Sequence, residues 1–315
     1  MTIAWVFPGQ GSQKLGMADS LLDLPGSRDR FELASQILGR DLWKICRGEE
    51  IPKDEIFDLN DTRNTQPALF VVESLLVDDL KRQERKTQLI AGHSLGEYSA
   101  LVAAQALSLK DGLELVSNRA SLMSEYSKTQ PTAMAAVIGL DANRVIELCE
   151  NMTKPNSVIE AVNFNSSLQT VVGGHVDAID KSVDVFKNEG AKIVKKLSVS
   201  LASHTSLLKL CSKELCKYMN NIEFKRPNFP IIHNFDASSK NQISDIISSL
   251  SEQVCSPVRW TESMMMISRI GINTFLEVGP GQVLTGLNKR IDKNFTTYPL
   301  CTESDMNKAE EELKQ

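Results

Sequence analysis

Short runs of consecutive apolar residues alternate along the chain with longer stretches in which apolar residues recur every three or four positions. The short runs predict buried strands, and the longer pattern predicts amphipathic helices. Towards the two ends of the chain, strands are expected at 2–7, 88–91, 230–235 and 273–278. Helices are expected at 28–39, 66–81, 97–106, 110–126, 204–219, 242–254, 258–269 and 282–291. This alternation is typical of an α/β domain built on a parallel sheet.

The middle of the chain has a different rhythm. Strands are expected at 133–139, 158–163, 169–173 and 191–199, with helices at 141–151 and 175–188 and a turn at 165–167. The order βαββαβ is that of a ferredoxin-like unit. We therefore expect an α/β fold with a hydrolase-like, parallel-sheet large domain (1–127 and 200–315) and an inserted ferredoxin-like small domain (128–199). Insertion at a surface loop is physically easy, because the ends of a compact domain lie close together.

Composition narrows the class of protein. The chain has 315 residues, 42% hydrophobic and 24% charged, which suffices for a large core. A net charge of −5 argues against nucleic-acid binding. No apolar run approaches a membrane span, and the N-terminus lacks the basic region of a secretory signal. The six cysteines form no zinc or redox pattern, so we expect small buried residues in a reducing cytoplasm.

The segment Gly92-His93-Ser94-Leu95-Gly96 matches the pattern G-x-S-x-G and lies between an expected strand and an expected helix. A sharp turn at this place projects the serine oxygen clear of the backbone, and the glycines leave room for it. The helix that follows offers unpaired N–H groups, including that of Leu95, to a developing oxyanion. The context predicts a nucleophilic Ser94, although a strand–turn–helix connection with an incidental serine would look similar.

A serine nucleophile needs a base, and the chain has four histidines. His93 adjoins the serine on a tight turn and is expected to point away, while His175 opens a helix and His233 lies in a strand. His204 lies where the chain re-enters the large domain, and α/β sheets place their sites at such strand ends. We favour His204 as the base, and the alternative is that His204 has a purely structural role. With no acidic residue marked out, a backbone carbonyl or an amide side chain is the expected orienting group.

Arg119 lies in a helix whose other face is apolar. A buried arginine is rare unless it is paired, and its planar guanidinium suits a carboxylate. The alternative is a surface arginine whose stem packs on the helix.

At this point the sequence resembles one family closely, the malonyl-CoA:acyl carrier protein transacylases of bacterial type II fatty acid synthesis. The matching segments run in the family's order from residue 5 to about 290. They are Phe7–Gln13, Thr65–Leu69, Ala91–Ala100, Asn163–Ser166, Ser203-His204, Pro257–Trp260, Glu277–Gly281 and Leu284–Leu287. The last 20 or so residues match nothing and look like a polar, helical tail.

The resemblance implies a role for each residue at a matching position. Ser94 would be the nucleophile and His204 its base, with Gln253 at the position that orients the histidine. The backbone amides of Gln10 and Leu95 would form the oxyanion hole. The malonyl carboxylate would be held by Arg119, with Gln66 in the same pocket. Asn163 and Asn165 would lie on the small-domain side of the cleft, near the thioester arm.

The family's reaction is a ping-pong transfer of malonyl from malonyl-CoA to acyl carrier protein, without a metal or redox cofactor. Two alternatives stay open: a free-standing acyltransferase that serves a polyketide synthase, and a non-catalytic scaffold on the same fold. Residues 200–204 carry Leu-Ala where close relatives often have Val-Pro, so the choice of extender unit also stays open. We further expect a cytoplasmic monomer.

Acyl carrier proteins are typically acidic, whereas this chain is net negative, so attraction between the two would have to be local. Basic residues gather around the last small-domain strand and on the closing helix, at Lys187, Lys192, Lys195, Lys196, Lys289 and Arg290. We expect the carrier protein to dock there, although a charged face in contact with solvent alone would show the same pattern.

Overall fold

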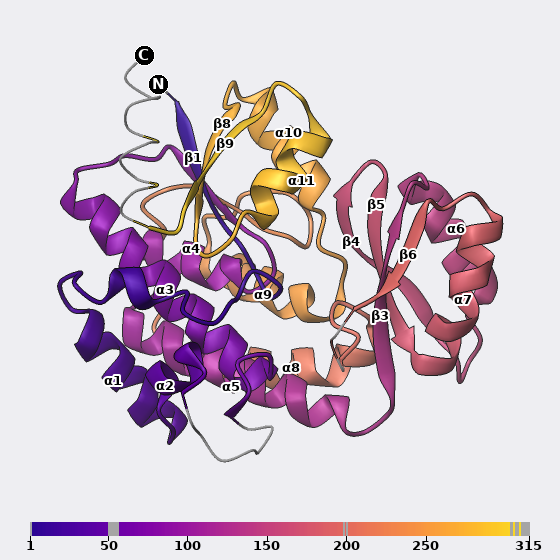
Figure 1. Cartoon of the computed structure of the whole chain (residues 1–315), viewed down its shortest axis with the longest axis horizontal. Helices are drawn as coiled ribbons and strands as arrows, with labels where there is room; N and C mark the ends of the chain where they lie inside the picture. Colours follow the sequence, from indigo (N-terminus) through magenta and orange to yellow (C-terminus); the bar gives the residue numbers. More distant parts are fainter. Residues whose placement is uncertain are drawn as a thin grey trace.

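The computed structural model describes residues 2–49, 57–197, 199, 201–302, 305 and 309. It is a mixed α/β protein with two separate sheets, as the sequence predicts (Figure 1). The elements of the middle of the chain form the second sheet, and those before and after it form the first.

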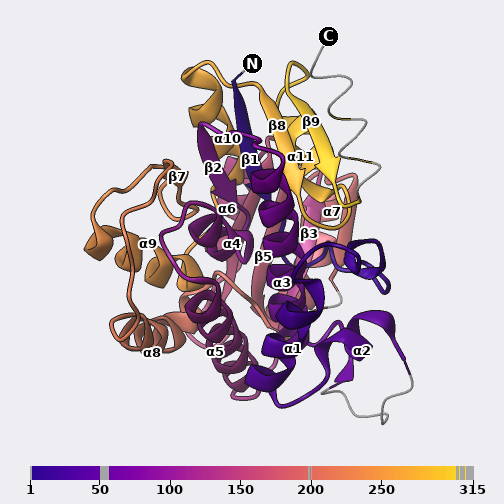
Figure 2. The same ribbon diagram turned by 90° about the vertical axis from the view of Figure 1, so that its left-hand side faces the viewer.

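The first sheet has five parallel strands in the order β7-β2-β1-β8-β9 (Figure 2). They are β1 (Ile3–Phe7), β2 (Leu89–Gly92), β7 (Ile231–Ile232), β8 (Thr274–Val278) and β9 (Thr296–Leu300). The first four lie in predicted strands, but β7 has two residues where six were expected, so His233 lies outside it. Strand β9 contradicts the expected helical tail. It is an edge strand with only Leu300 buried, so it has no continuous apolar run to reveal it. Most of the tail beyond it lies outside the described residues.

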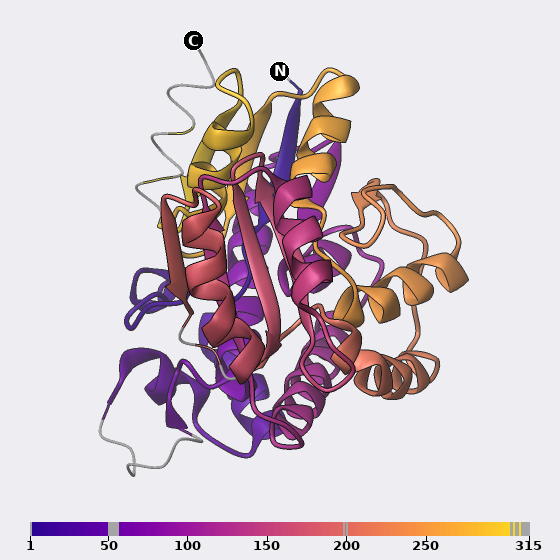
Figure 3. The ribbon, with the colours of Figure 1, turned by 90° about the vertical axis from the view of Figure 1, so that its right-hand side faces the viewer.

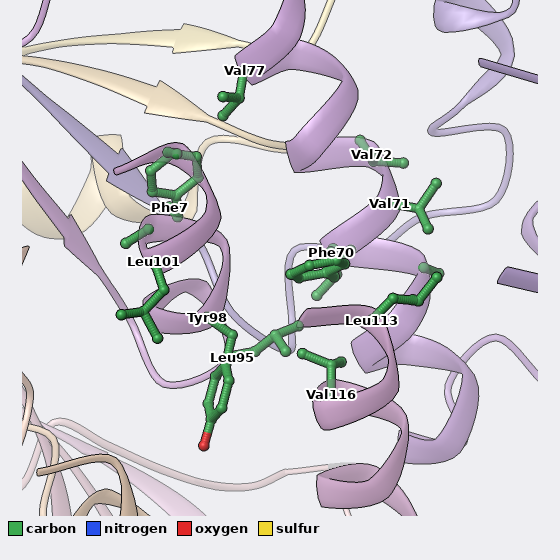
Figure 4. Packing of buried hydrophobic residues seen from close by; sticks show 14 of the residues in the cluster. Phe7, Phe70, Val71, Val72, Val77, Leu95, Tyr98, Leu101, Leu113 and Val116 are labelled. Atoms are coloured by element: carbon green, nitrogen blue, oxygen red, sulfur yellow. The ribbon is translucent and has the colours of Figure 1, made fainter. Parts of the chain in front are cut away.

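Helices cover both faces of this sheet. Because side chains alternate along a strand, Trp5 and Phe7 pack on one face and Ala4 and Val6 on the other. The first face lies against α3 (Thr62–Arg82), α4 (Gly96–Ala103) and α5 (Leu109–Ser127), whose side chains meet around Phe70 in Figure 4. The second face lies against α10 (Trp260–Arg269) and α11 (Val283–Ile291). The site is therefore built on a rigid, doubly covered sheet.

Helix α3 begins four residues before the predicted start, because Asp61 caps it there. Pro67 therefore lies inside the helix. The Oδ1 of Asp61 accepts from the N–H of Arg63 at 2.8 Å. A proline removes the N–H that would bond to the carbonyl four residues earlier. That carbonyl belongs to Arg63, and Nη2 of Arg40 donates to it at 2.8 Å instead. The helix thus tolerates its proline through a side chain from a distant segment.

The other helices of this part are α1 (Ser27–Leu38), α2 (Leu42–Arg47), α8 (Lys209–Met219) and α9 (Ile243–Cys255). The sequence did not predict α2, which is only six residues long. The expected helix at 204–219 is shorter than predicted. His204 has a φ of +65° and stands outside it, before a 3₁₀ turn at Ser206–Leu208. A non-glycine residue in this region of φ is held there by its surroundings.

The second sheet is antiparallel, in the order β4-β5-β3-β6, with α6 (Ala142–Met152) and α7 (Val176–Asn188) on its outer face (Figure 3). Its strands are β3 (Thr132–Ile138), β4 (Ile159–Ser166), β5 (Gln169–His175) and β6 (Ile193–Lys196). This is the predicted βαββαβ order. The turn lies two residues later than expected, because β4 continues through Ser166.

Backbone hydrogen bonds join β4 of the second sheet to the segment before α10, which packs on the first sheet. The N–H of Val258 donates to Val162 at 2.8 Å, and the N–H of Phe164 donates to Val258 at 2.9 Å. The inner face of the small sheet also packs on Ala202. These contacts bring β4 close to the carboxyl end of the parallel sheet.

The six cysteines are all free, but only Cys46, Cys149 and Cys211 are buried. Cys216, Cys255 and Cys301 are partly exposed, so the prediction that all six are buried is wrong for these three. Within the described ranges, every helix is too short or too polar to cross a membrane.

Candidate active site

Ser94 stands in a sharp turn between β2 and α4, with a φ of +53°. The two glycines of the motif are required by close packing. A Cβ on Gly92 would lie 2.0 Å from the carbonyl carbon of Gly96, and a Cβ on Gly96 would lie 2.2 Å from the oxygen of Phe7. No side chain fits at either position. The turn therefore has the form that the sequence motif predicts.

Asn234 holds this turn from both sides, a contact that the sequence analysis missed. Its Oδ1 accepts from the N–H of Ser94 at 2.7 Å, and its Nδ2 donates to the oxygen of Gly92 at 2.6 Å. Asn234 is the second residue after β7, which is the neighbour of β2 in the sheet. A polar residue at the carboxyl end of an adjacent parallel strand is a signal that could have indicated it.

His204 is the histidine that meets the serine. Its Nε2 lies 2.9 Å from Ser94 Oγ, and its Nδ1 lies 2.6 Å from the main-chain oxygen of Gln253. Because a carbonyl oxygen only accepts, Nδ1 carries the proton and Nε2 is free to accept one. No acidic residue is needed to select this tautomer.

The surroundings keep His204 neutral. It is 3% exposed, and burial together with the positive charge of Arg119 lowers its pKa to about 3. A neutral imidazole is the form that accepts a proton from a serine.

The three other histidines point elsewhere. His93 lies 2.9 Å from Asn165 Oδ1, away from the serine as expected. His175 contacts Gln130 in the small sheet, and His233 contacts the carboxylate of Glu97.

Arg119 reaches the serine from α5 and is 1% exposed, which rules out the surface arginine considered from the sequence. Its Nη2 lies 3.2 Å from Ser94 Oγ and 3.2 Å from Gln253 Oε1, and its Nη1 donates to Gln66 Oε1. The ring of Tyr98 lies 5.2 Å from the guanidinium carbon, within the range of a cation–π contact. No ion pair joins Arg119 to an acidic residue in the described part of the chain.

Of the two residues expected at an oxyanion hole, Leu95 follows the serine directly in the chain, and Gln10 lies in the loop after β1, the neighbour of β2 in the sheet. Leu95 precedes α4 directly, and the Gln10 side chain accepts from Thr62 Oγ1 at 3.1 Å. Thr62 in turn accepts from Gln66 Nε2 at 2.7 Å, so Gln10 is linked to the arginine pocket. The main-chain N–H groups of Gln10 and Leu95 donate to no other described residue.

Asn163 and Asn165 lie on β4 and are each 7% exposed. Asn165 contacts His93 of the turn, and Asn163 forms a bridge with Val258. Both therefore lie where the second sheet contacts the turn of Ser94 and the segment before α10.

Together these groups provide a serine with a neutral base at its oxygen and a buried cation 3.2 Å away. Such an arrangement suits nucleophilic attack on an acyl group that carries a negative charge.

A family model described as an acyl transferase domain matches residues 4–309, and this places the chain in that class of α/β proteins. The malonyl CoA-acyl carrier protein transacylase of Haemophilus influenzae is 38% identical over 313 residues, covering 98% of each chain. That of Escherichia coli K12 is 39% identical over 305 residues, covering 96% of this chain and 97% of that protein. The chain therefore belongs to the malonyl CoA-acyl carrier protein transacylase family.

Solved structures agree. The malonyl CoA-acyl carrier protein transacylase of Coxiella burnetii matches with a TM-score of 0.93 at 38% identity, covering 100% of this chain and 98% of that one. A malonyl-transacylase in complex with its type II polyketide synthase acyl-carrier protein also matches with a TM-score of 0.93. It is 37% identical and covers 99% of this chain and 100% of its own.

Proposed function

We propose that this protein transfers a malonyl group from malonyl-CoA to the phosphopantetheine thiol of acyl carrier protein, for fatty acid biosynthesis. The observation that carries this proposal is the guanidinium of Arg119. It is buried, it lies 3.2 Å from Ser94 Oγ, and it is held by two neutral amide oxygens without a paired acid. A buried charge without a partner is costly, and a carboxylate on the substrate would supply one.

In the first half of the reaction, Ser94 Oγ attacks the thioester carbon of malonyl-CoA, and His204 Nε2 takes the serine proton. The carbon–sulfur bond then breaks. The CoA sulfur leaves with the proton from His204, and malonyl remains as an ester on Ser94.

In the second half, the carrier thiol gives its proton to His204 and its sulfur attacks the ester carbon. The bond to Ser94 Oγ breaks, and the oxygen regains the proton. Malonyl leaves on the carrier, so each step uses only groups of the chain and of its two substrates. A narrow cleft with little water favours the thiol over hydrolysis.

The remaining site residues act on binding and charge. The N–H groups of Gln10 and Leu95 stabilise the oxyanion of each tetrahedral intermediate. Gln66 and Gln253 hold the Arg119 guanidinium towards the malonyl carboxylate, and the main-chain oxygen of Gln253 orients His204. Asn163 and Asn165 line the small-sheet side, where the pantetheine arm would pass.

We assign residues 128–199 to an inserted small domain and the rest to the large domain. The antiparallel sheet formed within residues 132–196, separate from the parallel sheet, supports this division. Residues 198 and 200, next to the boundary, lie outside the described ranges. Six free thiols support a reducing compartment such as the cytoplasm, where the protein would act as a monomer.

A second candidate partner is the carrier protein of a polyketide synthase. The similarity to a malonyl-transacylase solved with such a partner favours it. Transfer rates to the two kinds of holo carrier protein, measured side by side, separate the candidates. A non-catalytic scaffold is disfavoured because Ser94, His204 and Arg119 are all present and in contact.

Mass spectrometry of the intact chain tests the proposal. Brief exposure to malonyl-CoA should add one malonyl group to Ser94, and holo carrier protein should then remove it. An unmodified chain, or an ester that only water removes, would contradict the proposed transfer.

A further inference from the structure

A carboxylate that the proposed reaction does not use lies directly behind the nucleophile. Glu97 stands in the first turn of α4 and is fully buried. Its Oε1 accepts from Nδ1 of His233. Its Oε2 accepts from Gln253 Nε2 at 2.7 Å and from the main-chain N–H of Asn234 at 3.2 Å. Three donors from two other segments thus offset the cost of burying it.

The side-chain amide of Gln253 lies between Glu97 and Arg119. Its Nε2 donates to Glu97 and, at 2.9 Å, to the main-chain oxygen of Ser94. Its Oε1 accepts from Arg119 Nη2 at 3.2 Å. The two ends of a glutamine amide have nearly the same shape, so its orientation is decided by its partners. A carboxylate only accepts and a guanidinium only donates, and both partners therefore require the same orientation.

We propose that Glu97 is a positioning residue for Arg119 and Ser94, acting through Gln253, and that His233 holds Glu97 in place. This inference rests on the proposed function. By directing the oxygen of Gln253 towards the guanidinium, Glu97 keeps Arg119 Nη2 beside Ser94 Oγ. The amide also carries no charge of its own, so the positive charge of Arg119 stays available to a substrate carboxylate.

The opposite orientation of the Gln253 amide would be unfavourable. Its NH₂ group would face the guanidinium, so that buried hydrogen-bond donors would face each other without an acceptor. Each buried donor without an acceptor costs about 1–3 kcal/mol, equivalent to roughly 5- to 150-fold in a rate.

Glu97→Gln is the direct test, because it keeps the size of the side chain and leaves a single acceptor oxygen for three donors. We expect kcat/KM for malonyl-CoA to fall about 10- to 100-fold. The value for acetyl-CoA should fall less, because acetyl has no carboxylate for Arg119 to hold. A fall in the ratio of kcat/KM for malonyl-CoA to kcat/KM for acetyl-CoA distinguishes a loss of Arg119 positioning from a general loss of structure.

Two matched variants of His233 test the same proposal if the Glu97→Gln variant does not fold. The side-chain nitrogen of asparagine occupies nearly the place of histidine Nδ1, so His233→Asn retains the donor and His233→Leu removes it. We expect His233→Leu to lower the malonyl-to-acetyl ratio and His233→Asn to restore it. His175→Leu, in the small sheet, is the histidine control and should keep the ratio of the unmodified protein.

The rate at which phenylmethanesulfonyl fluoride labels Ser94 gives a readout that needs no malonyl substrate. Glu97→Gln and His233→Leu should slow labelling, because they loosen the contacts of Gln253 and Arg119 with Ser94. If the unmodified protein is labelled but transfers no malonyl, the proposed function fails, and the labelling rates alone decide the role of Glu97. If both variants are labelled and transfer malonyl at the original rates, the inference is overturned.

Discussion

The guanidinium Nη2 of Arg119 and the hydroxyl Oγ of Ser94 lie 3.2 Å apart, although one residue comes from the middle of a helix and the other from a turn. A positive charge therefore reaches the oxygen that would carry the acyl group. The same charge contributes to the low pKa of His204, whose Nε2 contacts that oxygen. Under the proposed function, the same guanidinium would bind the substrate carboxylate and help to keep His204 neutral.

Replacing Ser94 with alanine should abolish covalent labelling by malonyl-CoA. Because the oxygen that forms the ester is gone, transfer should fall by several orders of magnitude. Intact-mass measurement after brief exposure checks this. Full labelling of the Ser94→Ala variant would place the nucleophile elsewhere.

Arg119→Ala should cost malonyl transfer about 3–5 kcal/mol, the range for removing one partner of a buried ion pair. Acetyl-CoA should lose less, because a methyl group leaves the buried cation unpaired in the unmodified protein. Arg119→Lys should recover part of the loss, since a single ammonium does not reproduce the planar fork. The measurement is the ratio of kcat/KM for malonyl-CoA to that for acetyl-CoA. An equal fall for both substrates would make Arg119 a structural residue.

The pH dependence of acylation should reflect the pKa of His204, which is lowered to about 3. The base stays neutral above that value, so acylation should show no inflection from this group between about pH 5 and 8. Arg119→Gln removes the second cause of the lowered pKa and should move the acid limb upward, towards the ordinary value of 6.5. Single-turnover acylation across this range tests it. An unchanged profile in Arg119→Gln would contradict the coupling.

Charge reversal on the basic surface should weaken carrier-protein binding. Lys195 on β6 and Lys289 on α11 are exposed. Lys195→Glu and Lys289→Glu should raise KM for carrier protein and flatten its salt dependence, and leave acylation by malonyl-CoA unchanged. Lys86→Glu is the control, because Lys86 is exposed and lies before the amino end of β2, whereas Ser94 follows its carboxyl end. Unchanged values in the two test variants would reject this docking surface.

Glu73 should make the protein less stable as pH rises. It is fully buried, and burial raises its pKa well above 4.5. Above 4.5 the unfolded chain releases this proton while the native carboxyl keeps it. The contribution of Glu73 to the free energy of unfolding is therefore most favourable below pH 4.5. It falls by about 1.4 kcal/mol per pH unit towards the raised pKa.

Glu73→Gln keeps the shape of the side chain without the proton. Urea unfolding at about pH 5 and pH 8 should show a smaller loss of stability in the variant than in the unmodified protein. An equal loss in both proteins would show that Glu73 is not the source.

The structure has the predicted strands and helices where the apolar pattern of the sequence is clear. Their bounds differ from the prediction where a side chain from a distant segment binds the backbone of the element. The helix expected from residue 66 begins at Thr62, because Arg40 bonds to the carbonyl that Pro67 leaves free. Strand β9 was missed because a half-buried edge strand has no apolar run of its own. His204 is not helical, because its contacts with Ser94 and Gln253 hold its backbone at positive φ.

The sequence by itself determined the parts that depend on neighbours in the chain. A glycine at each side of Ser94, a strand before it and a helix after it are local features, and they define the turn and its serine. The tertiary structure decided the parts that depend on contacts between distant segments. It brought His204 rather than three other histidines to the serine, across 110 residues. It also buried Arg119 without an acidic partner and set Glu97 and Arg119 at opposite ends of Gln253, 156 and 134 residues away in the chain. Such contacts carry no periodic signal, because they arise only when the packed sheet and its helices bring the segments together.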